Sequence, residues 1–209
     1  MLGLILPAAL FVLLGVVQGG SLARWSAIHV RWWPLAAACL LAQVALFSPL
    51  LETQSLIVAY GPWLYVLSLV GVGATLLANA RAHTAARLSL TLAALGVALN
   101  CLVIVANGGY MPRSDGAAAA LGMPSSAQLL QERLVNVAPL SEETRLAWLG
   151  DTILEPSWLP LANVVSIGDL ILSTGLAWWA FRVTTASHAG SARTRQRRAE
   201  PDAALSSSN

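Results

Sequence analysis

The chain has 209 residues, of which 56% are hydrophobic and only 11% are charged. Charged residues make up about 25% of a typical soluble domain, so this composition excludes an ordinary water-soluble fold and favours an integral membrane protein. The formal net charge of +2 is too small to indicate a nucleic-acid-binding surface. We therefore expect membrane lipids, and no nucleic acid, among the partners of this chain.

Five segments are apolar enough to form membrane-spanning helices, which need about 20 apolar residues to cross a bilayer core about 30 Å thick. They cover about residues 2–17, 33–51, 56–78, 88–106 and 159–181. The first segment has neither the basic start nor the cleavage site of a signal peptide, so we expect it to be retained. The expected fold class is all-α membrane, a five-transmembrane-helix bundle in an integral membrane domain of residues 1–186.

The arginines predict the orientation of the bundle, because cytoplasmic connections carry an excess of basic residues. Arginines lie between the first two segments, between the third and fourth, and after the fifth: Arg24, Arg31, Arg81, Arg87, Arg182, Arg193, Arg195, Arg197 and Arg198. We therefore expect the N-terminus out and the C-terminus in, as in a multi-pass protein of the cytoplasmic membrane. Residues 187–209 are polar and basic, and their composition predicts a disordered cytoplasmic tail.

The longest connection, residues 107–158, is the predicted extracytoplasmic loop. Its first four residues are Asn107, Gly108, Gly109 and Tyr110. Two consecutive glycines end the fourth helix and permit a turn. Further along, Ser125 and Gln128 have the spacing of a helix capping box, and apolar residues then recur at helical spacing: Ala127, Leu130, Leu134 and Val137. The loop is therefore expected to be partly helical.

The fifth segment carries one acidic residue, Asp169, near the expected middle of the membrane. Polar residues share one face of this helix at 100° per residue: Asn163, Ser166, Asp169, Ser173 and Thr174. A carboxyl group at that depth costs about 2.5–3.5 kcal/mol, so it is expected to face the bundle interior. Asp169 is then either a functional group or a packing residue that hydrogen bonds to Asn100 or Ser166.

A polar seam between the fourth and fifth helices is the predicted binding site. Asn100, Asn107 and Gly96 share one face of the fourth segment, so this seam is expected to open outward. The candidate binding residues are Asn100, Asn107, Gly108, Gly109, Tyr110, Asn163 and Ser166. The candidate catalytic residues are Asp151, which lies in the loop just before the fifth segment, and Asp169.

Three functions fit this pattern. The first, which needs the fewest assumptions, is a structural or binding component that contacts an envelope protein partner or a second copy of itself. The second is an intramembrane aspartyl hydrolase in which Asp151 and Asp169 share a proton. A helix that begins near residue 159 would bury Asp169 about three turns deep, so this reading requires either a later helix start or water that penetrates to that depth. The third is proton- or cation-coupled transport in an oligomer.

The sequence predicts neither a metal site nor a cofactor. The three histidines, His29, His83 and His188, lack metal-ligand spacing, and no glycine-rich phosphate loop or nucleophile elbow is present. Cys39 and Cys101 fall inside apolar runs and are interpreted as buried thiols.

Three short motifs resemble an uncharacterised family of small prokaryotic integral membrane proteins, classed as a domain of unknown function (family 5317). They are Asn107-Gly-Gly-Tyr-Met-Pro112, Leu149-Gly-Asp151 and the stretch from Pro160 to Asp169. The resemblance covers nearly the whole chain and implies membrane residence in a bacterium, without an activity.

A more partial likeness is to lipoprotein signal peptidase, whose second catalytic aspartate lies in an Asn-x-x-Asp motif that opens the last helix. In this chain the spacing from Asn163 to Asp169 is longer, and Asp151 lacks the arginine that follows the first aspartate of that family. These departures argue against homology to that enzyme.

Overall fold

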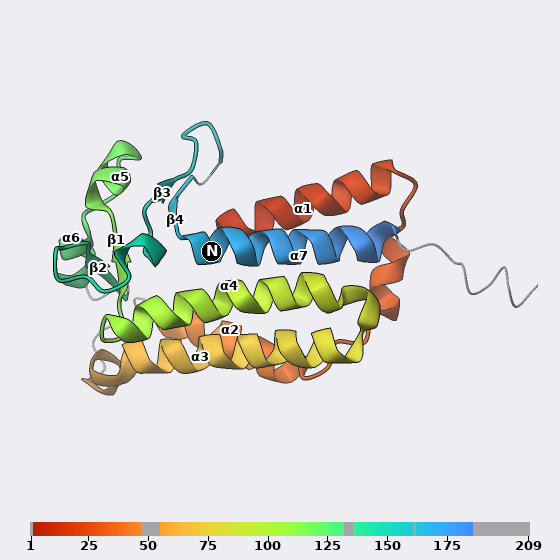
Figure 1. Cartoon of the computed structure of the whole chain (residues 1–209), viewed down its shortest axis with the longest axis horizontal. Coiled ribbons are helices and arrows are strands. Elements are labelled where there is room, and N and C mark those ends of the chain that lie inside the picture. Colours follow the sequence, from red (N-terminus) through yellow and green to blue (C-terminus); the bar gives the residue numbers. More distant parts are fainter. Residues whose placement is uncertain (1, 47–54, 132–135, 161, 186–209) are drawn as a thin grey trace, which may run out of the picture.

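The computed structural model describes residues 2–46, 55–131, 136–160 and 162–185, and this part of the chain is mostly helical. Long helices lie side by side, and shorter elements gather at one end of them (Figure 1). The long helices are α1 (Leu2–Val17), α2 (Trp33–Leu46), α3 (Ser55–Ala82), α4 (Arg87–Ala106) and α7 (Ile167–Thr185). The predicted tail, residues 187–209, lies outside the described residues.

The spatial order of the long helices differs from their order in the chain. The closest pairs are α4 with α7, α3 with α4, α1 with α7, and α2 with α3. By these contacts the helices follow one another as α1, α7, α4, α3 and α2, and the first helix packs against the last. In Figure 1, α2 lies behind α3 and α4. Two helical stretches among the described residues, Tyr60–Ala82 and Thr84–Ala106, are long and apolar enough to cross a membrane. The apolar stretches Pro7–Val17 and Trp33–Leu46 are shorter.

The connection between α4 and α7 folds into a small unit, which we call the cap (residues 107–166). Its helices are α5 (Asp115–Ala120), α6 (Ser126–Gln131) and the 3-10 turn η3 (Ala147–Leu149). Strand β1 (Met111–Arg113) pairs in parallel with β2 (Val137–Pro139), and β3 (Ile153–Leu154) pairs antiparallel with β4 (Val164–Val165). An apolar cluster of Val103, Ile104, Met111 and Leu149 joins the cap to the C-terminal end of α4.

The structure corrects two helix boundaries that the sequence suggested. The last helix begins at Ile167 and not near residue 159, because Val164 and Val165 are extended in the β4 strand. Asn163 consequently lies before the helix and does not belong to a stripe on it. In the cap, Val137 lies in β2 and not on the amphipathic helix, whereas Leu134 is outside the described residues.

Glycines let α4 and α7 approach until their backbones touch. A Cβ atom on Gly96 would lie 2.5 Å from the Gly168 carbonyl oxygen and from the Leu172 nitrogen. On Gly175 it would lie 2.5 Å from the Ala93 nitrogen. Small residues at such crossings stabilise membrane helix pairs, because they bring long stretches of backbone into van der Waals contact.

A single added methyl group should therefore weaken this contact. We expect Gly96→Ala to lower the Tm of the protein in detergent, since overpacking a fitted contact typically costs about 1–3 kcal/mol. Gly73→Ala is the matched control, because its new Cβ would lie 3.5 Å from the Val97 side chain, an ordinary contact. The control should keep or raise the Tm, since alanine is the better helix former by up to about 1 kcal/mol. Equal effects of the two substitutions would contradict the close α4–α7 contact.

Candidate functional site

Asp169 lies in the first turn of α7 and forms a reciprocal cap with Ser166. The Ser166 Oγ accepts a hydrogen bond from the Asp169 backbone nitrogen at 2.9 Å. In return, the Asp169 Oδ2 accepts hydrogen bonds from the Ser166 backbone nitrogen at 3.1 Å and from its Oγ at 2.9 Å. This is the capping-box arrangement with aspartate in the third helical position, and it fixes the carboxyl group at the helix N-terminus.

Asn100 extends this cap into a network between two helices. Its Nδ2 donates a hydrogen bond to the Asp169 Oδ1 at 2.8 Å, and its Oδ1 accepts one from the Ser166 Oγ at 2.9 Å. We call these three residues the polar seam. The Ser166 hydroxyl has one proton and faces two acceptors, Asn100 and Asp169, so the network has two alternative arrangements of that proton.

The glycines beside the polar seam make room for it. A Cβ on Gly168 would overlap the Asn100 side-chain oxygen. Asn100 therefore forms its hydrogen bonds at the same place where the backbones of α4 and α7 come into close contact. The structure thus brings together three of the predicted residues, and it places them where α7 begins and not three turns deep.

Asp151 lies just after η3, and its side chain is directed into the protein. Its backbone joins the turn after η3 to the β1 region of the cap, since its nitrogen donates to the Pro112 oxygen at 2.8 Å and its oxygen accepts from the Ser114 nitrogen at 2.9 Å. Its Oδ1 is buried and has no hydrogen-bond partner within the described part of the chain. Burial, and then the charge of Asp169, raise the pKa of Asp151 from its ordinary 3.8 to about 8, although Arg113 acts in the opposite direction.

The two candidate aspartates are therefore electrostatic neighbours. Tyr65 of α3 is the third member of this group, because both Asp151 and Asp169 act on it electrostatically. A neutral carboxyl beside a second, hydrogen-bonded carboxyl is the arrangement expected of paired acids, in which like charges oppose double ionisation. The group lies at the junction of the cap with α3 and α7.

The glycine-rich turn after α4 has a structural role. Gly108 and Gly109 have φ values of +69° and +96°, a region that favours glycine. The Asn107 Nδ2 donates to the Val103 oxygen at 2.8 Å and to the Arg145 oxygen at 2.9 Å, while its Oδ1 accepts from the Arg145 nitrogen at 3.0 Å. The Asn107 amide is thus occupied by main-chain partners, and it fixes the chain just before η3. The neighbouring Tyr110 is half-buried.

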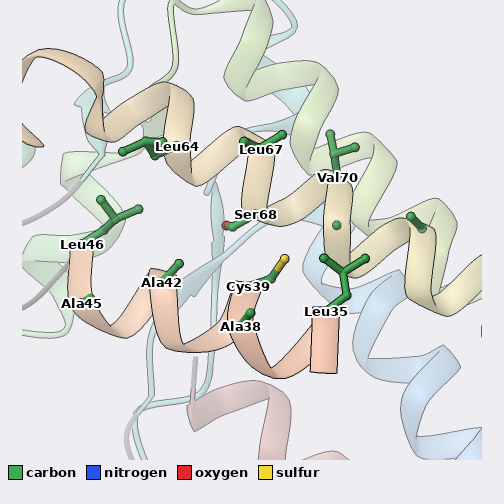
Figure 2. Close-up of a pocket in the computed structure, with 12 residues that line it drawn as sticks. Leu35, Ala38, Cys39, Ala42, Ala45, Leu46, Leu64, Leu67, Ser68 and Val70 are labelled. Atoms are coloured by element: carbon green, nitrogen blue, oxygen red, sulfur yellow. The ribbon is translucent and has the colours of Figure 1, made fainter. Parts of the chain in front are cut away.

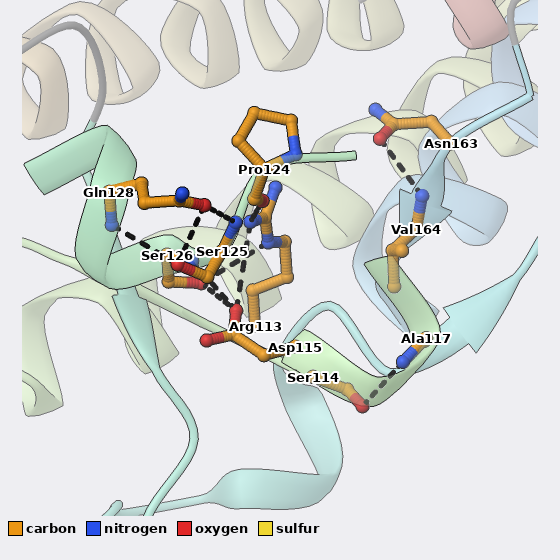
Figure 3. Close-up of polar contacts among 10 residues, drawn as sticks. All are labelled: Arg113, Ser114, Asp115, Ala117, Pro124, Ser125, Ser126, Gln128, Asn163 and Val164. Atoms are coloured by element: carbon orange, nitrogen blue, oxygen red, sulfur yellow. Dashed lines mark hydrogen bonds and ion pairs between the residues drawn. The ribbon is translucent and has the colours of Figure 1, made fainter. Parts of the chain in front are cut away.

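Asn163 shapes the turn between β3 and β4. Its backbone nitrogen donates to a Glu155 carboxylate oxygen at 2.9 Å, and its backbone oxygen accepts from the Glu155 nitrogen at 3.0 Å. Its side-chain oxygen accepts from the Val164 nitrogen at 2.9 Å (Figure 3). The hydrogen bonds of Asn163 are therefore with Glu155 and Val164 and not with the polar seam.

A buried arginine organises the cap. Arg113 is only 4% exposed. Its Nε donates to the Ser126 Oγ at 3.2 Å, its Nη2 donates to the Pro124 oxygen at 2.6 Å, and Nη2 lies 3.7 Å from the Asp115 carboxylate (Figure 3). Asp115 also accepts hydrogen bonds from the Ser126 nitrogen at 2.8 Å and Oγ at 2.5 Å. Sequence reasoning missed this group, because the hydrogen-bond partners of Arg113, Pro124 and Ser126, lie 11 and 13 residues away in the chain and meet it only in the folded cap.

Electrostatic interactions and a helix cap further stabilise the group of residues around Arg113. Burial acts to raise the pKa of Asp115, but the hydrogen bonds from Ser126 and the charge of Arg113 outweigh it, so the pKa is lowered overall. Next to it, the predicted capping box at the start of α6 is present. The Ser125 Oγ accepts from the Gln128 nitrogen at 3.2 Å, and the Gln128 Oε1 accepts from the Ser125 nitrogen at 2.8 Å (Figure 3). No group of three His, Cys, Asp or Glu side chains placed to hold a metal ion occurs among the described residues.

Comparison with known proteins gives one match. The profile of a family of unknown function, DUF5317, matches residues 27–181 and so covers α2, α3, α4, the cap and most of α7. No curated protein sequence matches the chain, and no solved structure does.

The buried proton of Asp151 predicts a pH dependence of stability. The folded protein keeps this proton up to about pH 8, whereas the unfolded chain loses it near its ordinary 3.8. The resulting stabilisation is complete below about pH 4 and is lost as the pH rises to about 8. We expect the Tm of the protein in detergent, followed by tryptophan fluorescence, to fall over this range, and Asp151→Asn to fall less. The exposed Glu142→Gln is the control, and an equally steep fall in Asp151→Asn would contradict the burial of this proton.

Proposed function

This chain belongs to the DUF5317 family of unknown function, and we propose that it is a multi-pass protein of the cytoplasmic membrane whose ordered extracytoplasmic cap binds another envelope protein. In this proposal all five long helices cross the membrane and the N-terminus is outside. The function is a binding one, and the cap is the part that meets the partner.

The observation that carries the proposal is an ordered cap that exposes large apolar side chains. The cap is held internally by Arg113 and its partners, and it is held on the bundle by the Val103 and Leu149 cluster. Yet Trp148 is 61% exposed and Trp158 is 78% exposed. Exposed aromatic side chains on an ordered support are typical of protein interfaces, where Trp is among the residues that contribute most binding energy.

The distribution of arginines supports the proposed orientation. At the end of the bundle away from the cap, the Arg24 guanidinium donates to the Thr184 backbone oxygen, and Trp25 Nε1 donates to the Thr184 Oγ1 at 3.2 Å. Arg31 lies at the same end, where its nitrogen donates to Asn79 at 2.8 Å. A basic end opposite the cap fits the positive-inside rule, with the cap outside.

Removal of the exposed cap tryptophans should weaken partner binding. We expect the double variant Trp148→Ala and Trp158→Ala to lose proteins that co-purify with the wild type after in-cell cross-linking and mild detergent extraction. Trp33→Ala is the matched control, because Trp33 is 63% exposed but lies at the start of α2, away from the cap. Partners retained by the double variant, or lost equally in the control, would argue against the cap as the binding surface.

A second candidate is an aspartyl hydrolase, which the late start of α7 favours. Because α7 begins at Ile167, Asp169 lies beside the cap and not three turns below it. Asp151 holds a proton at neutral pH, partly because of the charge of Asp169. In this scheme Asp169 takes a proton from a water molecule whose oxygen attacks the scissile carbonyl carbon, while Asp151 donates its proton to the carbonyl oxygen.

The binding function and the hydrolase function can be distinguished by comparing the termini of envelope proteins in cells that express variants of this protein. Under the hydrolase scheme, new termini produced by the wild type disappear in Asp151→Asn and in Asp169→Asn but persist in the exposed control Glu143→Gln. Asp169→Asn keeps the Asn100 and Ser166 geometry available, so a normal Tm together with lost cleavage would indicate a chemical role. Unchanged termini in all the variants would eliminate the hydrolase and leave the binding function.

A further inference from the structure

An apolar groove between α2 and α3 lies away from both the cap and the polar seam. Its volume is about 620 Å³, and it runs from Leu35 to Leu46 on α2 and from Leu64 to Ala74 on α3 (Figure 2). The two helices are in tight contact at Cys39 and Gly71, where an added Cβ on the glycine would overlap the Cys39 sulfur. Alanine and leucine side chains make up most of the lining of the space between the helices.

The lining of the groove offers nothing to a polar ligand. Apart from the thiol of Cys39, which is only a weak hydrogen-bonding group, Ser68 supplies the one polar side chain of the lining among the described residues, and that hydroxyl is already engaged. It donates to the Tyr65 oxygen at 2.6 Å and accepts from the Gln43 Nε2 at 2.9 Å. Binding sites orient polar ligands by a few free polar groups, and none is free here, so the complementary ligand is a hydrocarbon.

The position of the groove matches the middle of a membrane. Leu64 and Ala74 lie well inside the 28-residue helix α3, and the stretch between them is about 15 Å long, half of a bilayer core about 30 Å thick. A lipid headgroup would remain outside this depth, whereas an acyl chain reaches it. Among the described residues α2 packs chiefly against α3, and the groove between them is open to its surroundings.

We propose that the groove between α2 and α3 is a binding site for one acyl chain of a membrane lipid. The proposal rests on the membrane insertion proposed above. In the bilayer, acyl chains are the solvent around α2 and α3, so a second protein would have to displace them before it could dock. An empty groove would also leave its lining without the dispersion contacts that a chain supplies.

The test uses the whole protein in phosphatidylglycerol vesicles that contain a trace of an analogue with a diazirine in the distal half of one acyl chain. After illumination, we expect cross-links to concentrate on residues 35–46 and 64–74. Ala42→Phe, which fills the groove, should reduce this labelling severalfold, and Leu41→Phe should not, because Leu41 is 69% exposed and outside the groove. Ala74→Leu fills the groove from the other wall, so that a folding defect in one variant does not decide the result.

Three results would overturn the proposal. Labelling spread evenly over all apolar helices and unchanged by Ala42→Phe would mean that the groove holds no particular chain. Cross-linked dimers joined through this groove, with the lipid excluded, would mean that a second copy occupies it. Absence of lipid labelling on every helix would refute the membrane insertion itself, and this outcome differs from the other two.

Discussion

The backbones of α4 and α7 meet at Gly96, Gly168 and Gly175, and the cap end of the molecule depends on this contact. The cap leaves α4 at Asn107 and returns to α7 at Ser166, so the separation of its two ends is set by this pair of helices. The same approach places Asn100 within hydrogen-bonding distance of Asp169. A side chain at Gly168 would remove the space for the Asn100 amide, so the apolar contact and the polar seam form one arrangement.

The polar groups at this junction differ in how well they are satisfied. Both oxygens of Asp169 accept hydrogen bonds, and Arg113 has partners on two of its nitrogens. In a low-dielectric interior such hydrogen-bonded groups stabilise the fold, whereas an unpaired group is costly. Two atoms of the cap are exceptions, because the Asp151 Oδ1 and the Asn136 Nδ2 are buried without a hydrogen-bond partner among the described residues, and Asp151 keeps its proton instead. Stability at the cap junction is therefore linked to protonation of a single residue.

Sequence patterns predicted the structural features that depend on residues close together in the chain. The start of α1 and the ends of α4 agree with the expected segments to within a residue, because long apolar runs and a following Gly-Gly turn mark them. The meeting of Asn100, Ser166 and Asp169 also followed from helical spacing. The start of α7 did not, because the spacing of Ser166 and Asp169 fits both a helical stripe and an N-terminal capping box, and strand pairing with β3 decides between them. The burial of Arg113 and Asp151 depends on contacts between distant segments, which no local pattern contains.

The central claim is an ordered cap on the outer side of a membrane-spanning bundle, and site-directed labelling tests it most directly. Both native cysteines, Cys39 and Cys101, are replaced by alanine, and single variants Thr152→Cys in the cap and Ser26→Cys at the opposite end are expressed in cells; both positions are exposed. The account predicts that a membrane-impermeant maleimide labels Thr152→Cys in intact cells and labels Ser26→Cys only after permeabilisation. The reverse pattern, or labelling of both positions from the same side, would contradict it.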